Sequence, residues 1–162
     1  MIVDADALNV VSEYEMFGRV DSSPSCIVTP HPGEFARLTG LSVAEIQDHR
    51  TGVARDFAAK HKVVVVLKGA GTVVTDGDRV FVNSTGNSGM ATGGSGDVLT
   101  GIIAAQIGQG LSLFDAARLA VHLHGTAGDL AASETSERGL IASDLLRFLG
   151  PAWRRLHTDS LE

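Results

Sequence analysis

The chain has one cysteine, few aromatic residues and no apolar run long enough to cross a bilayer. The single Cys26 excludes an internal disulfide and is typical of a protein kept in a reducing cytosol. Because only 5% of the 162 residues are aromatic, the core must be aliphatic and rich in alanine. The N-terminus lacks the basic and apolar regions of a signal peptide, so we expect a cytoplasmic location.

Positive charge is also scarce. Thirteen Lys and Arg residues stand against nineteen Asp and Glu residues, which gives a net charge of −6. This balance disfavours nucleic acid and anionic membranes as partners. It does not disfavour a nucleotide, because local glycine loops and one lysine can outweigh the global field. The length and an apolar content of 44% fit one α/β domain over residues 1–162.

Apolar strand-like runs alternate with helical patterns, which predicts an α/β fold with a mostly parallel sheet flanked by helices. The expected strands are Ile2–Asp4, Cys26–Thr29 and Val63–Leu67, followed by a hairpin of Thr72–Thr75 and Arg79–Asn83. The expected helices are Ala7–Phe17, Gly33–Leu38, a long one from the Ser42 capping box toward Lys60, one after Gly96, Phe114–Ala132, and a last one capped by Ser143 and broken near Gly150-Pro151.

Four motifs follow expected strands: Asp4-Ala5-Asp6, Thr29–Glu34, Lys68–Thr72 and a glycine-rich loop after the hairpin. Ligands of such sheets bind at the carboxyl ends of the strands. We therefore expect these motifs to meet at one edge of the sheet and to form the site there.

The glycine-rich segment N-S-G-M-A-T-G-G-S-G-D-V-L-T-G over residues 87–101 carries the strongest signal. It predicts a loop that feeds a helix N-terminus, with Asp97 in the first turn. Such a terminus offers free backbone N–H groups to an anion, and Asp97 can accept a proton from a substrate hydroxyl. In the alternative interpretation, the loop is only a tight turn and Asp97 only complements the helix dipole. The pattern matches neither the Walker nor the dinucleotide glycine motif.

The segment T-P-H-P-G-E fixes a rigid turn, since two prolines flank His31. His31 is a candidate to contact a polar ligand. Glu34 is a candidate to hold a Mg²⁺ ion through a bound water. The alternative is a structural turn in which Glu34 favours the helix dipole.

The segment Lys68-Gly69-Ala70-Gly71-Thr72 ends the buried valine strand. Its glycines let the backbone approach a ligand, and Lys68 can meet a phosphate as a point charge. The alternative is a β-turn with an exposed lysine.

Several weaker candidates remain open. Asp4 and Asp6 can bind ligand hydroxyls, influence a metal, or cap the following helix. Asn83 and Asn87 can orient phosphates or satisfy turn geometry. His122 and His124 are two residues apart on an expected helix, so they face different ways and make a poor metal pair. We interpret these two histidines as packing residues or residues behind the site.

The chain resembles the ADP/ATP-dependent NAD(P)H-hydrate dehydratases, a branch of the ribokinase-like superfamily. The G-x-G-D signature at Gly94–Asp97 is that of ribokinase-like enzymes in general, and T-P-H-P-G-E together with G-M-A-T-G-G-S-G-D marks this branch. The matching segments run in family order: V-D-A-D-A-L-N (3–9), T-P-H-P-G-E-F-A-R-L (29–38), V-L-K-G-A-G-T (66–72), N-S-T-G-N-S-G-M-A-T-G-G-S-G-D-V-L-T-G (83–101) and A-V-H-L-H-G-T-A-G-D (120–129).

The resemblance implies a ribokinase-like fold and the repair of hydrated NADH or NADPH, with ADP or ATP and Mg²⁺ required. It implies that Asp97 is the catalytic base and contacts the hydrate, and that His31 also binds this small-molecule substrate. The implied nucleotide-binding residues are Lys68, Gly69, Ala70, Gly71, Thr72 and Gly96.

Family members carry a substantial segment before the D-A-D motif, so the resemblance implies a chain that corresponds to the C-terminal portion and lacks the N-terminal part of the fold. Two other functions stay open: a small-alcohol kinase of the same superfamily, and a nucleotide-binding module without catalysis. An exposed sheet edge and an alanine-rich helix favour a homo-oligomer.

Overall fold

The computed structural model describes residues 1–13, 24 and 26–159. Within this part of the chain, a five-stranded sheet has the strand order β1-β2-β3-β4-β5. The strands are β1 (Ile2–Val3), β2 (Ile27–Val28), β3 (Val64–Leu67), β4 (Val73–Thr75) and β5 (Val80–Val82). Strands β1, β2 and β3 are parallel, while β3–β4 and β4–β5 are antiparallel. The expected hairpin is confirmed, and the sheet is mixed rather than mostly parallel because the hairpin supplies two of its strands.

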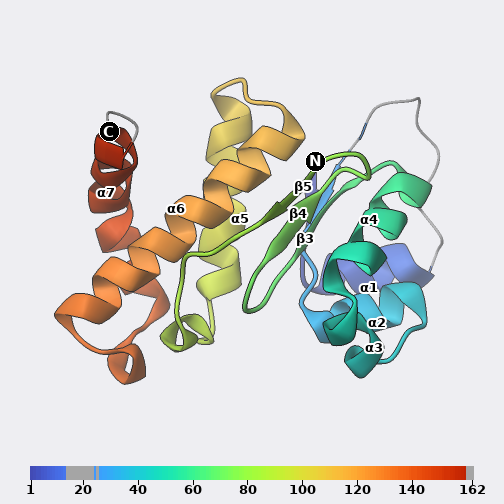
Figure 1. The fold of residues 1–162 in the computed structure, drawn as a ribbon, viewed down its shortest axis with the longest axis horizontal. Coiled ribbons are helices and arrows are strands. Elements are labelled where there is room, and N and C mark those ends of the chain that lie inside the picture. Colours follow the sequence, from blue (N-terminus) through green and yellow to red (C-terminus); the bar gives the residue numbers. More distant parts are fainter. Residues whose placement is uncertain (14–23, 25, 160–162) are drawn as a thin grey trace.

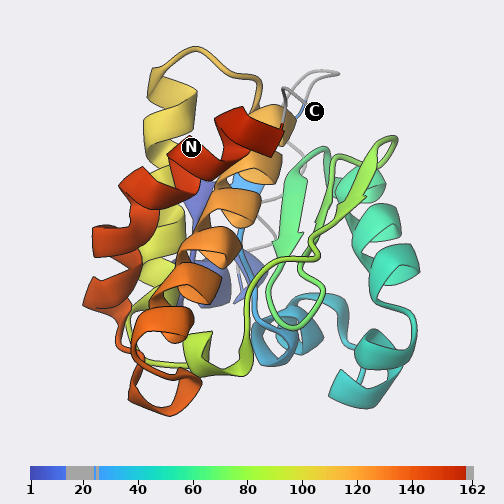
Figure 2. The same ribbon diagram turned by 60° about the vertical axis from the view of Figure 1, so that its left-hand side comes forward.

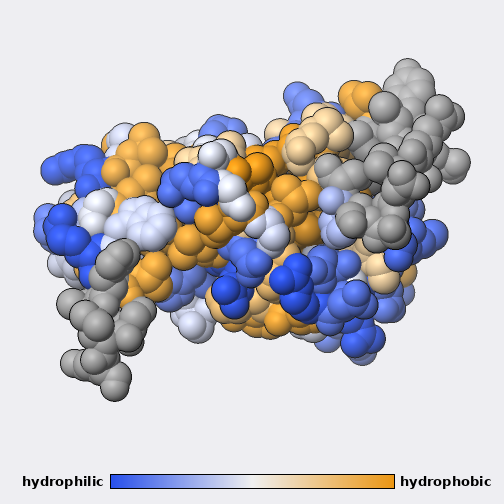
Figure 3. Space-filling view, turned by 90° about the horizontal axis from the view of Figure 1, so that it is seen from above, coloured by the Kyte–Doolittle hydropathy of each residue, from blue (hydrophilic) through white to orange (hydrophobic). Residues whose placement is uncertain are grey.

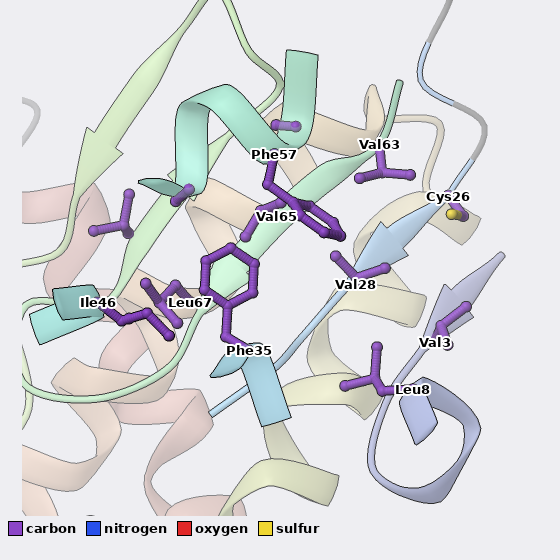
Figure 4. Close-up of a cluster of buried hydrophobic side chains, with 13 residues drawn as sticks. Val3, Leu8, Cys26, Val28, Phe35, Ile46, Phe57, Val63, Val65 and Leu67 are labelled. Atoms are coloured by element: carbon purple, nitrogen blue, oxygen red, sulfur yellow. The ribbon is translucent and has the colours of Figure 1, made fainter. Parts of the chain in front are cut away.

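Helices cover both faces of the sheet (Figure 1). On one face lie α1 (Asp6–Glu13), α2 (Pro32–Thr39), α3 (Val43–Asp48) and α4 (Arg50–His61). Their apolar side chains enclose one core cluster with the sheet, in which Phe35 and Phe57 meet edge to face (Figure 4). On the other face lie α5 (Ser95–Gly108) and α6 (Leu113–Glu134), whose cluster contains Val64 and Val66. Because β3 is buried on both faces, it reads as an uninterrupted run of apolar residues.

The last helix, α7 (Ala142–Asp159), packs along α6 (Figure 2). Two short 3-10 turns complete the described structure, η1 (Ser88–Met90) and η2 (Glu137–Gly139). No helix in the described part is both long and apolar enough to cross a membrane.

Two helix predictions are wrong. The segment after the Ser42–Glu45 capping box, which is confirmed, breaks at His49 into α3 and α4. The break lets the Arg50 side chain reach the end of β3, a tertiary contact that periodicity does not reveal. Helix α7 begins at Ala142 and continues through Pro151. Proline removes one helical hydrogen bond, and the packing of Ala152 and its neighbours on α6 offsets that loss.

The other predicted elements lie where expected, within a few residues at each end. Helix α1 is described as far as Glu13, so the end predicted at Phe17 lies outside the described residues. The fold therefore places the ends of β1, β2 and β3 and the start of α5 near one another, which brings the sequence motifs together.

Candidate active site

Lys68 lies at the centre of a charged cluster that joins four of the motifs. Its Nζ donates to Asp4 Oδ1 at 2.9 Å and lies 3.8 Å from Glu34 Oε2. Thr100 Oγ1 on α5 donates to the other Asp4 oxygen, also at 2.9 Å. The ends of β1 and β3, the start of α2 and the first turns of α5 are thus linked by side-chain contacts.

Asp4 links the members of this cluster through its carboxylate. Partial burial by itself would raise the pKa of Asp4, but hydrogen bonds from Lys68, Thr29 and Thr100 and the charge of Lys68 bring it below its usual value. Asp4 is therefore ionised at neutral pH and holds Lys68 against the N-terminus of α5. A Cβ atom at Gly96 would lie 3.5 Å from Lys68 Nζ, so the ammonium borders that backbone. Asp6, by contrast, is the exposed first residue of α1.

The loop of residues 68–72 wraps around the guanidinium of Arg50. Arg50 Nη2 donates to the carbonyl oxygens of Leu67 and Lys68 at 2.9 and 3.2 Å. Gly69 has a φ of +130°, and a Cβ there would lie 3.4 Å from both terminal nitrogens of Arg50. Thr72 Oγ1 donates to the carbonyl of Gly69 at 2.9 Å and closes the loop. Gly69, Ala70 and Gly71 remain exposed, so the outer side of the loop is open to a ligand.

The start of α2 is a closed capping box. His31 Nδ1 accepts hydrogen bonds from the N–H groups of Gly33 and Glu34 at 3.0 and 3.2 Å. Glu34 Oε2 accepts from the His31 N–H at 2.7 Å. Both residues therefore form a reciprocal cap, a more specific structural role than the turn of the alternative interpretation. The side chain of His31 is still 52% exposed, and Glu34 is buried beside Lys68, so each also borders the charged cluster.

The start of α5 is open. Its N-cap, Gly94, has a φ of +88°, and no side chain caps the helix. Within the described residues, the N–H groups of Gly96 and Asp97 have no acceptor, and the exposed Asp97 carboxylate makes no hydrogen bond or ion pair. Free amides, the positive end of the helix dipole and the nearby Lys68 ammonium are the features that bind a phosphate.

The segment before this helix is fixed on α6. The Asn83 side chain donates to the carbonyls of Thr85 and Val121, and Asn87 donates to Asp129. These contacts give both asparagines a structural role that extends beyond the local turn to α6. His124 is buried beneath the first turn of α5, with its Nε2 3.0 Å from the Ser95 carbonyl oxygen.

The structure thus gathers Asp4, Glu34, Lys68 and Gly96, with His31 and Asp97 at the borders. Sequence reasoning missed Arg50 and Thr100. Thr100 lies inside the quoted glycine motif, three residues after Asp97, where one helical turn separates neighbours on a face. Arg50 belongs to no motif, and nothing in its local pattern marked it. No group of three or more His, Cys, Asp or Glu side chains in the described part could hold a metal directly.

The fold is that of a ribokinase-like α/β protein, and the start of α5 at its site has no side-chain cap. A ribokinase-like superfamily protein of Enterococcus faecalis shares the fold at a TM-score of 0.77 and 27% identity, over 94% of this chain and 52% of that one. A hydroxyethylthiazole kinase from Pyrococcus horikoshii shares the fold alone, at 19% identity and a TM-score of 0.72, over 94% of this chain and 59% of that one.

A family model described as NAD(P)H-hydrate dehydratase matches residues 1–150, and the chain belongs to this family. The ADP-dependent (S)-NAD(P)H-hydrate dehydratase of Neisseria meningitidis is 42% identical over 158 residues, which are 96% of this chain and 52% of that protein. The ADP/ATP-dependent NAD(P)H-hydrate dehydratase of Bacillus subtilis, co-crystallised with ATP and Mg²⁺, superposes with a TM-score of 0.83 at 39% identity. That match covers 95% of this chain and 55% of the other, so the chain spans about half the length of these relatives.

Proposed function

We propose that the chain catalyses the ADP-dependent dehydration of hydrated NADH or NADPH, which restores the reduced nicotinamide. The main observation in support is the uncapped start of α5 next to Lys68. The unbonded amides of Gly96 and Asp97 lie at this helix start, and the Lys68 ammonium borders Gly96, which are features that favour a nucleotide phosphate. Family membership supplies the substrate class, and the Neisseria relative is named as ADP-dependent.

In this proposal, Lys68–Thr72 and Gly96 bind the nucleotide. The exposed backbone of Gly69–Gly71 approaches it, while Arg50 fixes the loop from the inner side. Lys68 has three N–H donors. One is bonded to Asp4, and the ammonium stays next to Gly96 to meet a phosphate oxygen.

Asp97 takes the role of general base. It removes the proton of the hydroxyl on the nicotinamide ring as that oxygen attacks the terminal phosphorus of ADP, and AMP leaves. The phosphorylated hydrate then loses a ring proton and inorganic phosphate, and the ring double bond forms. The hydroxyl oxygen leaves within the phosphate, so the products are NAD(P)H, AMP and phosphate. The free amides at the start of α5 stabilise negative charge on the transferring group.

His31 contacts the hydrate in this proposal, and Glu34 holds Mg²⁺ through water. The donor set fits this ion, because Mg²⁺ is usually held by one or two carboxylates, phosphate oxygens and several waters. Two carboxylates, those of Asp4 and Glu34, lie within 4 Å of the Lys68 ammonium at this edge. When bound, Mg²⁺ neutralises charge on the phosphates.

The test is Asp97→Asn in the chain as it exists, with Asp115→Asn as its control. Both aspartates are the third residue of a helix, α5 and α6 respectively, so both changes neutralise a first-turn carboxylate. Asp115 also accepts a hydrogen bond from Ser112 and pairs with Arg79 and Arg118, so its replacement reports any loss of rate that comes from stability alone. The assay follows recovery of reduced-nicotinamide absorbance from hydrated NADH with Mg-ADP, and calorimetry measures Mg-ADP binding. We expect Asp97→Asn to lose about a hundred- to ten-thousand-fold in kcat with Mg-ADP affinity nearly intact. Asp115→Asn should keep its rate.

Residual activity above about a tenth in Asp97→Asn would contradict the assignment of the base. Wild-type turnover of an alcohol with Mg-ATP, but not of the hydrate, would favour a small-alcohol kinase instead. Nucleotide binding without either turnover would favour a module without catalysis.

Self-association and a cytoplasmic location stay predictions. The edge strand β5 exposes Val80 and Val82, at 40% and 52%, and these residues favour contact with a second copy of the chain. Figure 3 shows apolar residues gathered across the middle of one face of the molecule. Light scattering tests the first prediction, since a monomer over the whole concentration range would contradict it, and cell fractionation tests the second.

A further inference from the structure

The first turn of α5 is held differently from the first turns of α2, α3 and α6, and it shares its lack of a side-chain cap with α4. In α2, α3 and α6 a side chain accepts hydrogen bonds from first-turn amides: His31, Ser42 and Ser112. In α5 no side chain does so. Besides its backbone hydrogen bonds, this turn has a side-chain contact from α6, where His124 meets Ser95, the first residue of α5.

His124 makes this contact from a buried position. Its Nε2 lies 3.0 Å from the Ser95 carbonyl oxygen and 3.3 Å from Ser95 Oγ, and the residue is 9% exposed. The carbonyl oxygen can only accept, so Nε2 carries the hydrogen and donates it. Burial lowers the pKa of His124 to about 4, so the ring is neutral at physiological pH and adds no positive charge behind the loop.

The geometry of the trans peptide bond fixes the direction of the Gly96 N–H group relative to the Ser95 carbonyl group. In a trans peptide the C=O and N–H groups point in opposite directions, and no peptide bond in the described part is cis. The Ser95 carbonyl faces His124, so the N–H of Gly96 in the same peptide unit faces away from His124, and Gly96 borders Lys68. His124 thus fixes the first turn of α5 through the Ser95 carbonyl group, and the amide N–H groups of Gly96 and Asp97 in that turn stay unbonded.

We propose that His124 is a positioning residue, which holds the Ser95–Gly96 peptide so that the Gly96 and Asp97 amides stay directed at the transferring phosphoryl group. The inference deepens the proposed function and rests on it. A side-chain cap of the usual kind would occupy the donors that the reaction needs. Fixing the turn through its carbonyl avoids that conflict and keeps the donors preorganised for the charge that develops in the transition state.

The test compares His124→Leu, His124→Gln and His122→Leu. Leucine fills much of the space of the ring but donates nothing, whereas glutamine keeps an N–H donor of similar reach. His122 is the control, since it is half-buried on the same helix and, in the described part of the chain, its side chain makes no hydrogen bond or ion pair with α5. If His124→Leu does not fold, the more adaptable His124→Met takes its place.

Two measurements are made on each variant. Steady-state kinetics with hydrated NADH and Mg-ADP gives kcat and KM. Backbone ¹⁵N relaxation gives the order parameters of Gly96 and Asp97 and needs neither ligand nor turnover. We expect His124→Leu to lose at least about tenfold in kcat with KM for ADP changed less than about threefold. The Gly96 order parameter should fall from about 0.85 to below about 0.6. His124→Gln should recover both values, and His122→Leu should match the wild type.

An unchanged Gly96 order parameter in His124→Leu would overturn the inference. So would equal losses of kcat in the leucine and glutamine variants, because a purely structural histidine gives that pattern. If the wild-type chain shows no dehydration at all, the proposed function fails. The order parameters then still decide whether His124 holds the turn.

Discussion

Two helices of this protein begin at the same edge of the sheet, and they begin in opposite ways. At the start of α2, the His31 side chain accepts hydrogen bonds from the Gly33 and Glu34 amides, and the Glu34 side chain accepts one from the His31 amide. The two residues thus form a reciprocal capping box. At the start of α5, Gly94 offers no cap, and the Gly96 and Asp97 amides are unbonded within the described residues. Both segments look like ligand loops in the sequence. The two starts thus differ in whether their first-turn amides are already bonded, and our proposal assigns the unbonded amides of α5 to an anion.

The largest expected effect concerns the histidine behind the open start. The pKa of His124 is lowered from 6.5 to about 4 by burial, so between these pH values the unfolded chain binds more protons than the folded chain. Stability is therefore fully present above pH 6.5 and declines as the pH falls toward 4, by about 3 kcal/mol for a shift of this size. Urea unfolding at several pH values measures it. His124→Gln should flatten this slope, and an unchanged slope would contradict the assignment.

The next test removes the Lys68 ammonium, which lies beside the starts of both α2 and α5. Lys68→Met leaves Asp4 and Glu34 without their shared ammonium and takes a positive charge away from the start of α5. We expect the Kd for Mg-ADP to rise about ten- to a hundredfold, since a hydrogen bond to a charged group contributes about 1.5–3 kcal/mol. Calorimetry measures the change, with Lys60→Met on the exposed end of α4 as control. Equal affinities in the two variants would place the phosphates elsewhere.

A methyl group added at Gly96 is expected to block the open start of α5 while the protein stays folded. Gly96→Ala places Cβ 3.5 Å from Lys68 Nζ, an ordinary contact, in the space assigned to a phosphate oxygen. Gly101→Ala in the same helix meets nothing within 4 Å and is the matched control. Both changes should leave the protein folded and raise helix propensity by up to about 1 kcal/mol. Only Gly96→Ala should weaken Mg-ADP binding, by about tenfold or more, and a similar affinity in both would argue against the site.

The smallest effect is expected at the closed start. His31→Ala removes the acceptor for the Gly33 and Glu34 amides and should cost about 1 kcal/mol of unfolding free energy. His31→Asn keeps a cap and should recover most of it. If His31 also contacts the hydrate, both variants raise KM for that substrate and leave Mg-ADP affinity unchanged. Equilibrium unfolding and steady-state kinetics separate the two roles. A normal KM in both variants would show that His31 only caps the helix.

The sequence predicted the parts of the fold that local pattern determines. The valine run of β3, the hairpin, the Ser42–Glu45 box and the helix that follows the glycines are all present. The meeting of the motifs at one sheet edge follows from parallel strand ends and is confirmed by the contacts of Lys68. These features depend on residues close together in the chain or on a general rule of topology.

What the sequence did not predict depends on contacts between distant residues. Arg50, which follows the break between α3 and α4, reaches carbonyls 17 and 18 residues further along the chain. Helix α7 continues through Pro151 because α6 packs against it. The closed state of α2 and the open state of α5 also depend on side-chain orientation, which a pattern of residue types does not specify.

The most direct test of the open start is a titration of the ¹⁵N-labelled chain with Mg-ADP, followed through its backbone amide resonances. The account predicts that the Gly96 and Asp97 amides shift strongly and saturate at the calorimetric Kd. The Gly33 and Glu34 amides, already bonded to His31, should move little. Saturable binding that leaves the Gly96 and Asp97 resonances in place, or no binding at all, would contradict the central claim that the uncapped start of α5 receives the nucleotide phosphate.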